Sequence, residues 1–378
     1  MKSTIVNTSK EMMSYSDFPP PEHYPNFMHN RLVKKYLDLY VEHFSLLQYI
    51  QFDTEVISIT QASDYETTGK WKVTTSKSQT VEIFDGVMIA SGHHMSPLVA
   101  EFPGQEKFEG DVLHSQLYKE PSPYEGKNVL IVGMGNSAVD AAVELSRVAN
   151  KVYLSTRRGA WLWNRVFKRG WPYDLCVFSR FLELLKKICP DDLLNSYFEH
   201  LVNGRMDHEL YGLKPSHRFF SQHPSVNDTL PNCLLSGQII LKGDVDRFDG
   251  KKRVVFKDQS SVTVDTVILC TGYNITFPFL SEGILSVQNN DLDLYHLVFP
   301  PHLKHPTLAV IGLIQPYGAV QPISELQSRW VALCMDGSVL LPPEAEMRAK
   351  IAEMKAEMRK RYVNSPRHTV QVRLFCEL

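Results

Sequence analysis

Three small residues at fixed spacing, Gly133, Gly135 and Ala138, are the chemically most informative part of the sequence. The first glycine permits a tight turn after a strand, the second lets the backbone approach a pyrophosphate, and the small third residue lets the next helix pack closely. The first N–H groups of a helix lack intrahelical partners and attract phosphates. We therefore expect a dinucleotide site here, with a purely structural turn as the alternative. Its expected contacts are Gly133, Gly135, Asn136, Ser137, Ala138, Val139 and Asp140.

The residues that follow the next predicted strand indicate which dinucleotide binds. NAD sites carry an acidic residue about 20 residues after the glycine turn, where it holds the ribose 2′-hydroxyl. This chain has Thr156, Arg157 and Arg158 instead. Hydroxyl and guanidinium groups suit a 2′-phosphate by charge and by bidentate geometry. The sequence therefore favours NADPH, and a solvated basic turn is the alternative.

These residues need a βαβ unit to position them, and the sequence around them has that pattern. Residues 127–132 are predicted to form an apolar strand, 139–148 a helix and 151–155 a second strand, which implies a parallel sheet. Further expected elements are helices at 30–47, 178–188, 193–202 and 344–362, strands at 49–59, 70–75, 86–90, 261–270 and 307–312, and antiparallel strands within 239–258 that turn at Asp249-Gly250.

Composition places the chain among ordinary globular proteins. It has 378 residues, 43% hydrophobic and 22% charged, with a formal net charge of -2. That charge balance gives no reason to expect nucleic acid as a partner. The six cysteines are scattered, which is typical of a reducing compartment. We find no signal peptide and no stretch apolar enough for a membrane helix, so this chain is expected to be soluble.

Several strings along the chain together resemble one family. Residues 108–118 match the pattern F-x-G-x-x-x-H-x-x-x-[YW] of flavin-containing and Baeyer–Villiger monooxygenases, and they precede the glycine turn as in that family. The chain resembles most the animal, dimethylaniline-type flavin-containing monooxygenases. Further matching strings lie at residues 10–19, 24–27, 154–157, 227–231, 271–273, 311–314 and 325–330.

The resemblance implies an α/β fold with two Rossmann-like dinucleotide-binding domains and a mainly helical insertion. It implies FAD and NADPH as cofactors, O₂ as co-substrate, and oxygenation of soft nucleophiles such as amine nitrogen and sulfide sulfur through a C4a-hydroperoxyflavin. The cofactor carries that chemistry, and the protein supplies orientation and exclusion of water. The family resemblance also implies an endoplasmic reticulum membrane location.

The resemblance also assigns residues outside the glycine turn. Asn7 matches the family's catalytic asparagine beside the flavin and nicotinamide, where its amide can donate hydrogen bonds; a local turn role is the alternative. The other expected cofactor contacts outside the turn are Val6, Thr8, Gly272 and Gln327. His114 is expected to link domains and not to be catalytic, and no metal site is expected.

The sequence resembles an internal part of the family pattern, without the family's first and last segments. Residues 1–97 and 273–378 are expected to be the remnant of the FAD domain, 98–158 and 239–272 the NADPH domain, and 159–238 the insertion. The FAD-binding G-x-G-x-x-G unit and the C-terminal membrane tail have no counterpart in the sequence. We therefore expect weak or absent FAD binding and low turnover. A non-catalytic NADP-binding protein and a Baeyer–Villiger oxygenase of ketones are the alternatives.

Overall fold

The computed structural model describes residues 1–77, 81–179, 188–366 and 368–372, and they form two compact units. Unit 1 comprises Met1–Ser9, Asn26–Asn30 and Pro97–Gly272, whereas unit 2 comprises Lys10–Pro25, Arg31–Ser96 and the described part of Tyr273–Leu378. Which unit corresponds to which predicted cofactor domain stays a prediction. The predicted mixed α/β class with a parallel sheet is confirmed.

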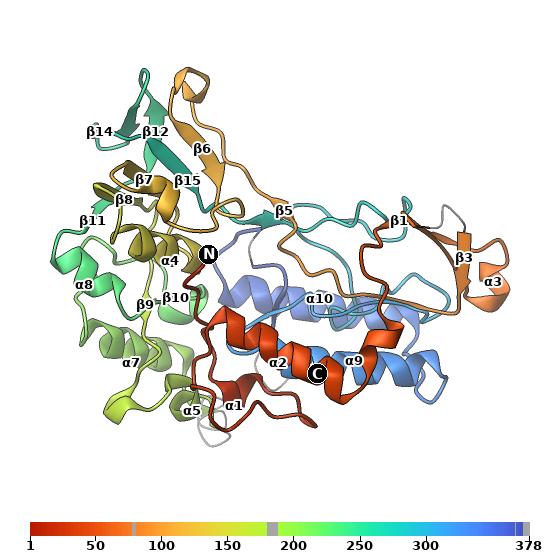
Figure 1. Ribbon diagram of the computed structural model, residues 1–378. Coiled ribbons are helices and arrows are strands. Elements are labelled where there is room, and N and C mark those ends of the chain that lie inside the picture. The colour runs from red at the N-terminus through yellow and green to blue at the C-terminus, as the bar shows by residue number, and fades with distance from the viewer. Residues whose placement is uncertain (78–80, 180–187, 367, 373–378) are drawn as a thin grey trace. The chain divides into compact units, whose positions relative to one another are not determined.

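Unit 1 is built on a five-stranded sheet in the order β11-β8-β7-β15-β6, and every neighbouring pair is parallel. Figure 1 shows α4 lying against these strands. The predicted βαβ unit is confirmed as β7, α4 and β8, although the helix begins and ends three residues earlier than expected. The strands are β6 (Asp111–His114), β7 (Asn128–Val132), β8 (Lys151–Ser155), β11 (Ile239–Lys242) and β15 (Thr266–Leu269), and the helix is α4 (Asn136–Leu145).

Both faces of this sheet are buried because successive side chains of a strand point to opposite sides. In β7, Val129 and Ile131 join the core that contains the apolar face of α4. Leu130 and Val132 join a second core with Phe248 and Phe256 from the antiparallel strands on the other side. This double burial explains why the strand sequence is a continuous apolar run.

The expectation of antiparallel strands throughout 239–258 was wrong for its first part. β11 pairs in parallel with β8 and extends the main sheet. Only β12 (Val245–Phe248), β13 (Arg253–Phe256) and β14 (Ser261–Thr263) form the antiparallel sheet, with Gly250 at a positive φ of 92° in the predicted turn. The predicted strand 261–270 is accordingly two strands, β14 and β15, in different sheets.

The inserted region packs around an aromatic cluster in which the rings of Phe198 and Phe219 lie about 5.5 Å from Trp163. The predicted helix 193–202 lies within α7 (Asp191–Asn203), whereas most of the predicted helix 178–188 lies outside the described residues. The other elements of this region are β9 (Leu162–Trp163), α5 (Tyr173–Val177), β10 (Ser225–Val226) and α8 (Leu230–Leu235).

Unit 2 contains a three-stranded antiparallel sheet, a parallel strand pair and two long helices. The sheet is β1 (Val56–Gln61), β2 (Trp71–Thr75) and β3 (Val81–Phe84); the parallel pair is β4 (Val87–Ile89) with β17 (Leu308–Val310); the helices are α9 (Gln321–Met335) and α10 (Glu344–Arg361). The predicted strand 49–59 was wrong in its first half, because Tyr49 ends a 3-10 helix (Leu46–Tyr49) and β1 begins only at Val56. The shorter elements are α1 (Lys10–Met13), α3 (Tyr65–Thr68), β5 (Ser96–Pro97), β16 (Tyr273–Asn274), β18 (Gln315–Pro316) and β19 (Gln371–Val372).

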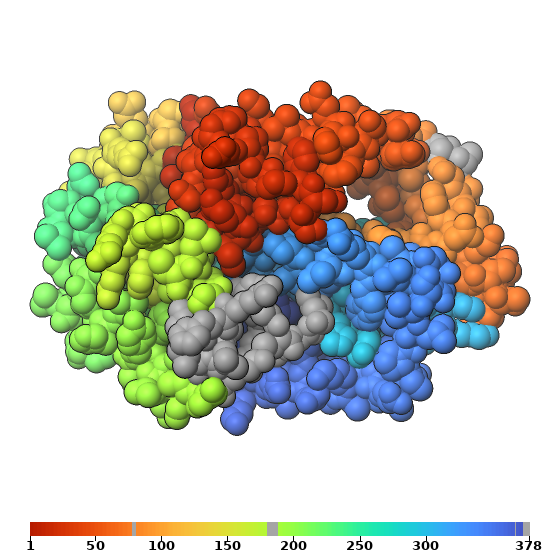
Figure 2. Space-filling model, turned by 90° about the horizontal axis from the view of Figure 1, so that it is seen from below, coloured from red at the N-terminus to blue at the C-terminus, as the bar shows by residue number. Residues whose placement is uncertain are grey.

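The aromatic residues near the start of the chain pack on helix α2 (Asn30–His43) of unit 2. Tyr36 is its one buried side chain; its hydroxyl donates to the carbonyl of Phe18 at 2.5 Å and accepts from the N–H of Tyr15 at 3.0 Å. The rest of α2 lies at the surface seen in Figure 2. Across the described residues, no helix combines the length and apolarity needed to cross a membrane.

Candidate functional site

The glycine turn joins β7 to α4 and leaves its middle residues open. Gly133 has a φ of +127°, and a Cβ there would lie 2.6 Å from the carbonyl oxygen of Cys270, so the position requires glycine. Gly135 is exposed, and a Cβ there would meet nothing within 4 Å. Ala138 is fully buried in the core between helix and sheet. Each residue therefore has the environment that the dinucleotide motif requires.

The first residues of α4 present backbone N–H groups to the open side of the turn. Asn136 and Ser137 are exposed, and as the first helical residues they have no intrahelical acceptor for their N–H groups. The next residue in the predicted set, Val139, is fully buried, and its N–H bonds the carbonyl of Gly135 at 3.1 Å. Val139 therefore supports the turn from inside.

Residues of the inserted region fix the side chains around the turn. The Asn136 Oδ1 accepts from the N–H of Val226 at 2.7 Å, and the Asp140 Oδ1 accepts from Asn227 Nδ2 at 3.0 Å. Ser225 Oγ also donates to the carbonyl of Met134. Burial raises the pKa of Asp140, and the Asn227 hydrogen bond opposes this shift. These supporting residues were missed from the sequence, although residues 227–231 were noted as a motif.

The end of β8 places two arginines at the edge of the sheet where the glycine turn lies. β7 and β8 are parallel neighbours, and the N–H of Gly133 donates to the carbonyl of Ser155 at 3.0 Å. Thr156 Oγ1 accepts from the N–H of Gly159. Arg157 and Arg158 are exposed, and neither forms an ion pair within the part of the chain that the structure describes. Two uncompensated positive charges thus lie where a 2′-phosphate is expected.

The segment that contains Val6, Asn7 and Thr8 is held in unit 1 by residues of the insertion. Arg165 Nη2 donates to Asn7 Oδ1 at 2.7 Å, and the Tyr173 hydroxyl donates to the Asn7 carbonyl at 3.1 Å. The N–H of Ser9 donates to Asp174 Oδ2 at 2.6 Å, and burial raises the pKa of this carboxyl group. Asn7 is half-buried at the end of these contacts.

The two parallel strands of unit 2 end at glycines with left-handed backbone. Gly92 follows β4 and Gly312 follows β17, each with a φ of 73°. A Cβ at Gly92 would meet nothing within 4 Å. The carboxyl edge of parallel strands is where α/β proteins bind ligands.

Gln327 of α9 lies at this edge of unit 2. Its side chain is 1% exposed, and Oε1 accepts from the N–H of Gly312 at 3.0 Å. Its Nε2 is buried with no hydrogen-bond partner in the described chain. A buried donor of this kind usually serves a bound group or a water.

The remaining predicted residues have structural contacts in unit 1. Gly272 has a φ of +96°, and its carbonyl accepts from the N–H of Leu98 at 2.9 Å. His114 Nε2 lies 3.0 Å from the same carbonyl. Burial lowers the pKa of His114, and the bond to Gly272 opposes this shift. Both residues thus connect backbone segments at the end of β15.

Comparison with known proteins shows the family of this chain. The family model "FMO-like: Flavin-binding monooxygenase-like" matches residues 1–377. The chain belongs to this family. It is 50% identical to flavin-containing monooxygenase 5 of Rattus norvegicus over 375 residues, which cover 98% of this chain and 70% of the relative. The Homo sapiens protein of the same name is 49% identical over 376 residues, with the same coverage of both chains.

Solved structures of flavin monooxygenases share the fold. S-allyl-L-cysteine S-oxygenase from Allium sativum matches with a TM-score of 0.70 and 25% identity, covering 98% of this chain and 70% of that one. A cyclohexanone monooxygenase bound to ε-caprolactone also matches with a TM-score of 0.70, at 16% identity, covering 97% of this chain and 87% of that one. The second likeness supports the fold alone. FAD and NADPH are the cofactors of the family to which this chain belongs.

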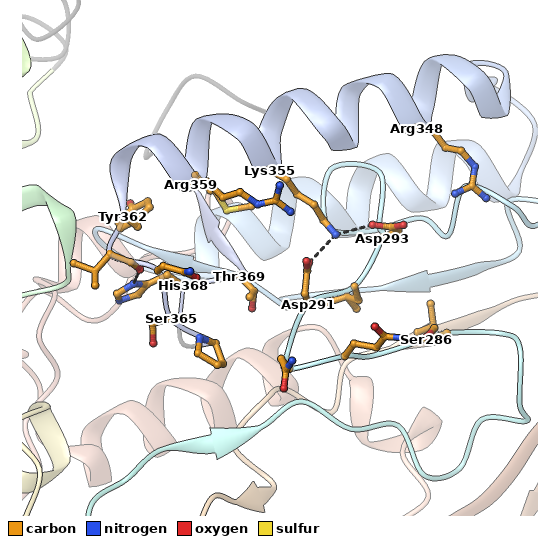
Figure 3. A pocket seen from close by; sticks show the side chains of 18 of the residues that line it. Ser286, Asp291, Asp293, Arg348, Lys355, Arg359, Tyr362, Ser365, His368 and Thr369 are labelled. Atoms are coloured by element: carbon orange, nitrogen blue, oxygen red, sulfur yellow. Dashed lines mark hydrogen bonds and ion pairs between the residues drawn. The ribbon is translucent and has the colours of Figure 1, made fainter.

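One cavity of this flavin-binding monooxygenase-like chain is lined by none of the predicted site residues. It has a volume of about 970 Å³ and lies in unit 2, beside α10 (Figure 3). Lys355 Nζ pairs there with Asp291 Oδ1 and Asp293 Oδ1, each at 2.6 Å. The candidate cofactor sites in this chain are the glycine turn and the ends of the parallel strands.

Proposed function

We propose that the chain binds NADPH at the glycine turn of unit 1 and, with FAD, oxygenates soft nucleophiles such as amine nitrogen and sulfide sulfur. The single observation that carries the proposal is the open turn at Gly135 beside Arg157 and Arg158, which form no ion pair with any residue that the structure describes. When bound, FAD supplies the activation of O₂ and NADPH supplies the reducing equivalents. Both chemistries belong to the cofactors, so the residues of this chain bind, orient and exclude water.

On the NADPH side, the N–H groups of Asn136 and Ser137 would hold the pyrophosphate, because they are exposed and lack intrahelical acceptors. Arg157 and Arg158 would hold the 2′-phosphate by charge-assisted hydrogen bonds, with Thr156 beside them. The amide of Asn7 would donate a hydrogen bond to a bound cofactor.

On the flavin side, two features of unit 2 fit a bound group. Gly92 leaves space at the end of β4, and Gln327 Nε2 is a buried donor without a partner among the described residues. These residues would line the flavin, and Gly312 would present its backbone close by.

The substrate class is supported by the names of related proteins. A Rattus norvegicus relative that is 43% identical carries the name dimethylaniline monooxygenase, N-oxide-forming, and the Allium sativum structure is that of an S-oxygenase. These names describe oxygen transfer to nitrogen and to sulfur. The endoplasmic reticulum as location stays a prediction from the family resemblance.

The decisive experiment titrates NADPH and NADH into the purified full chain and measures bound FAD in the same sample. We expect a saturable complex that is tighter with NADPH. With excess FAD added, a tertiary amine and a thioether should each gain one oxygen atom by mass spectrometry, at the low turnover that the sequence predicts. A folded sample without saturable NADPH binding would overturn the proposal. NADPH binding without flavin would support the non-catalytic alternative, and lactone formation from a ketone would support the Baeyer–Villiger alternative.

A further inference from the structure

Arg165 is the most heavily bonded side chain around Asn7. Its side chain is 9% exposed, and its guanidinium donates to four acceptors. Nε donates to the Val6 carbonyl at 3.1 Å, and Nη1 donates to Asp228 Oδ2 at 3.2 Å. Nη2 donates both to the Ile5 carbonyl at 3.2 Å and to Asn7 Oδ1 at 2.7 Å. All three nitrogens are therefore committed to fixed partners.

The chemistry of a guanidinium decides which end of the Asn7 amide faces it. Arginine has only donors, so the atom of Asn7 that contacts Nη2 must be the carbonyl oxygen. The amide nitrogen Nδ2, with its two N–H groups, then points away from Arg165. Nδ2 has no acceptor among the residues that the structure describes. The Tyr173 hydroxyl also holds the Asn7 backbone carbonyl, so the residue is held at two points.

We propose that Arg165 is a positioning residue that fixes the Asn7 amide with both N–H donors left for a bound cofactor. The inference rests on the proposed function, because the cofactor bound in that function is the group that would accept hydrogen bonds from the Asn7 amide. Turning the amide over would set its N–H groups against those of the guanidinium. A donor that is already oriented needs no rearrangement when charge develops on the group it binds.

Asp228 in turn holds Arg165 in place by two hydrogen bonds. Its Oδ1 accepts from the backbone N–H of Arg165 at 3.0 Å, while Oδ2 accepts from the guanidinium. The carboxylate thus compensates the largely buried charge and selects one side-chain conformation. Asn7, Arg165 and Asp228 form one hydrogen-bonded chain from the N-terminal segment to the inserted region.

The test compares Arg165→Met and Arg165→Lys with Arg218→Met in the full chain supplied with excess FAD. Lysine keeps the positive charge beside Asp228 but lacks the planar fork that bonds several acceptors at once. Arg218 is a matched control, since it bonds Glu199 and Asp192 in the inserted region without touching Asn7. We expect both Arg165 variants to lower the oxygenated product formed per NADPH consumed by about tenfold, with a matching rise in hydrogen peroxide. Arg218→Met should keep the wild-type ratio.

Repeating Arg165→Met in an Asn7→Ala background separates positioning from a general structural role. If Arg165 acts through Asn7, its loss should produce no further fall in product per NADPH there. Thermal unfolding without substrate gives a second readout. When Arg165 is present, Asn7→Asp should leave the melting temperature unchanged or raise it, because the guanidinium can pair with the new carboxylate. In the Arg165→Met background the carboxylate has no such partner, and Asn7→Asp should lower the melting temperature by about 2–4 °C.

Three outcomes count against the inference. A folded Arg165→Lys chain with the wild-type product ratio would overturn it, as would equal losses with and without the Asn7 side chain. In both cases the proposed function would stand, because the wild-type chain still turns over. A wild-type chain that consumes no NADPH would overturn the proposed function and this inference with it.

Discussion

A first side-chain carbon at Gly133 would lie 2.6 Å from the backbone carbonyl oxygen of Cys270. Cys270 directly follows β15, the strand that lies beside β7 in the sheet, so the absence of a side chain at Gly133 lets the glycine turn approach the neighbouring strand closely. Gly135, two residues later, has the opposite environment, with open space around it. The two glycines of one motif therefore have separable roles.

Gly133→Ala should destabilise the fold, and Gly135→Ala should not. Alanine at Gly133 meets a backbone atom and must adopt a φ of +127°, which costs about 1–3 kcal/mol of unfolding free energy. Alanine at Gly135 has room in the free protein but occupies the space where a pyrophosphate would approach. We expect urea unfolding to detect the first change, and NADPH titration to detect the second as a loss of affinity. Equal stability of the two variants would contradict this assignment.

Arg157→Ala combined with Arg158→Ala should remove the preference for NADPH over NADH. Both arginines lack ion-pair partners in the described chain, so their loss leaves the fold intact and takes away the charges proposed to hold the 2′-phosphate. We expect NADPH affinity to fall by about 10- to 100-fold toward that for NADH. Arg147→Ala with Lys151→Ala is the matched control, because Lys151 starts β8 at its opposite end. An unchanged cofactor preference would refute the assignment.

Tyr118→Phe should destabilise unit 1. The Tyr118 hydroxyl donates to Glu144 Oε2 at 2.8 Å, and the two side chains are only 1% and 8% exposed. Removing the hydroxyl leaves a buried carboxylate with one donor fewer, at a cost of about 1–3 kcal/mol. Tyr124→Phe is the control in the same cluster, since its ring packs 5.6 Å from that of Tyr118. Chemical unfolding of the two variants measures the difference.

Lys355→Met should destabilise unit 2 by about 1–2 kcal/mol. This cost is smaller than for a fully buried ion pair, because solvent screens the partly exposed Asp291 and Asp293. Burial lowers the pKa of Lys355, but the hydrogen bonds that Lys355 donates to Asp291 and Asp293 outweigh burial and raise this pKa above its usual value of 10.5. A raised lysine pKa adds stability that is fully present below pH 10.5 and is lost as the pH rises through the folded-state value. The wild-type advantage over Lys355→Met should therefore shrink in alkaline buffer. Lys350→Met, which removes an exposed pair with Glu353 on the same helix, should have a smaller effect.

Features set by neighbouring residues could be predicted from the sequence. The strands and helix around Gly133 were found because the turn glycines and the apolar periodicity lie within about 30 residues. The partner of residues 239–242 was missed, because β11 pairs with a strand some 90 residues earlier, and nothing in its short apolar pattern specifies parallel or antiparallel pairing.

Among the site residues, too, those close to the motif in sequence could be predicted, and those that depend on distant contacts could not. Arg157 and Arg158 were predicted because they follow the second strand directly. Arg165 was not predicted, because its importance depends on a hydrogen bond to Asn7, 158 residues earlier. No spacing rule links those two positions, and only the folded chain brings them together.

The division of the chain between the two units also bears on the order of events during synthesis. Asn7 is synthesised well before the guanidinium that holds it, which belongs to a residue 158 positions later in the chain. Bringing Asn7 and Arg165 together closes a long loop, which costs conformational entropy and delays the hydrogen bond between them. The Asn7 side chain therefore lacks this partner until translation has passed Arg165, although the Val6 N–H can already bond the Met28 carbonyl. Residues 97–272 expressed alone would contain the sheet but not Asn7.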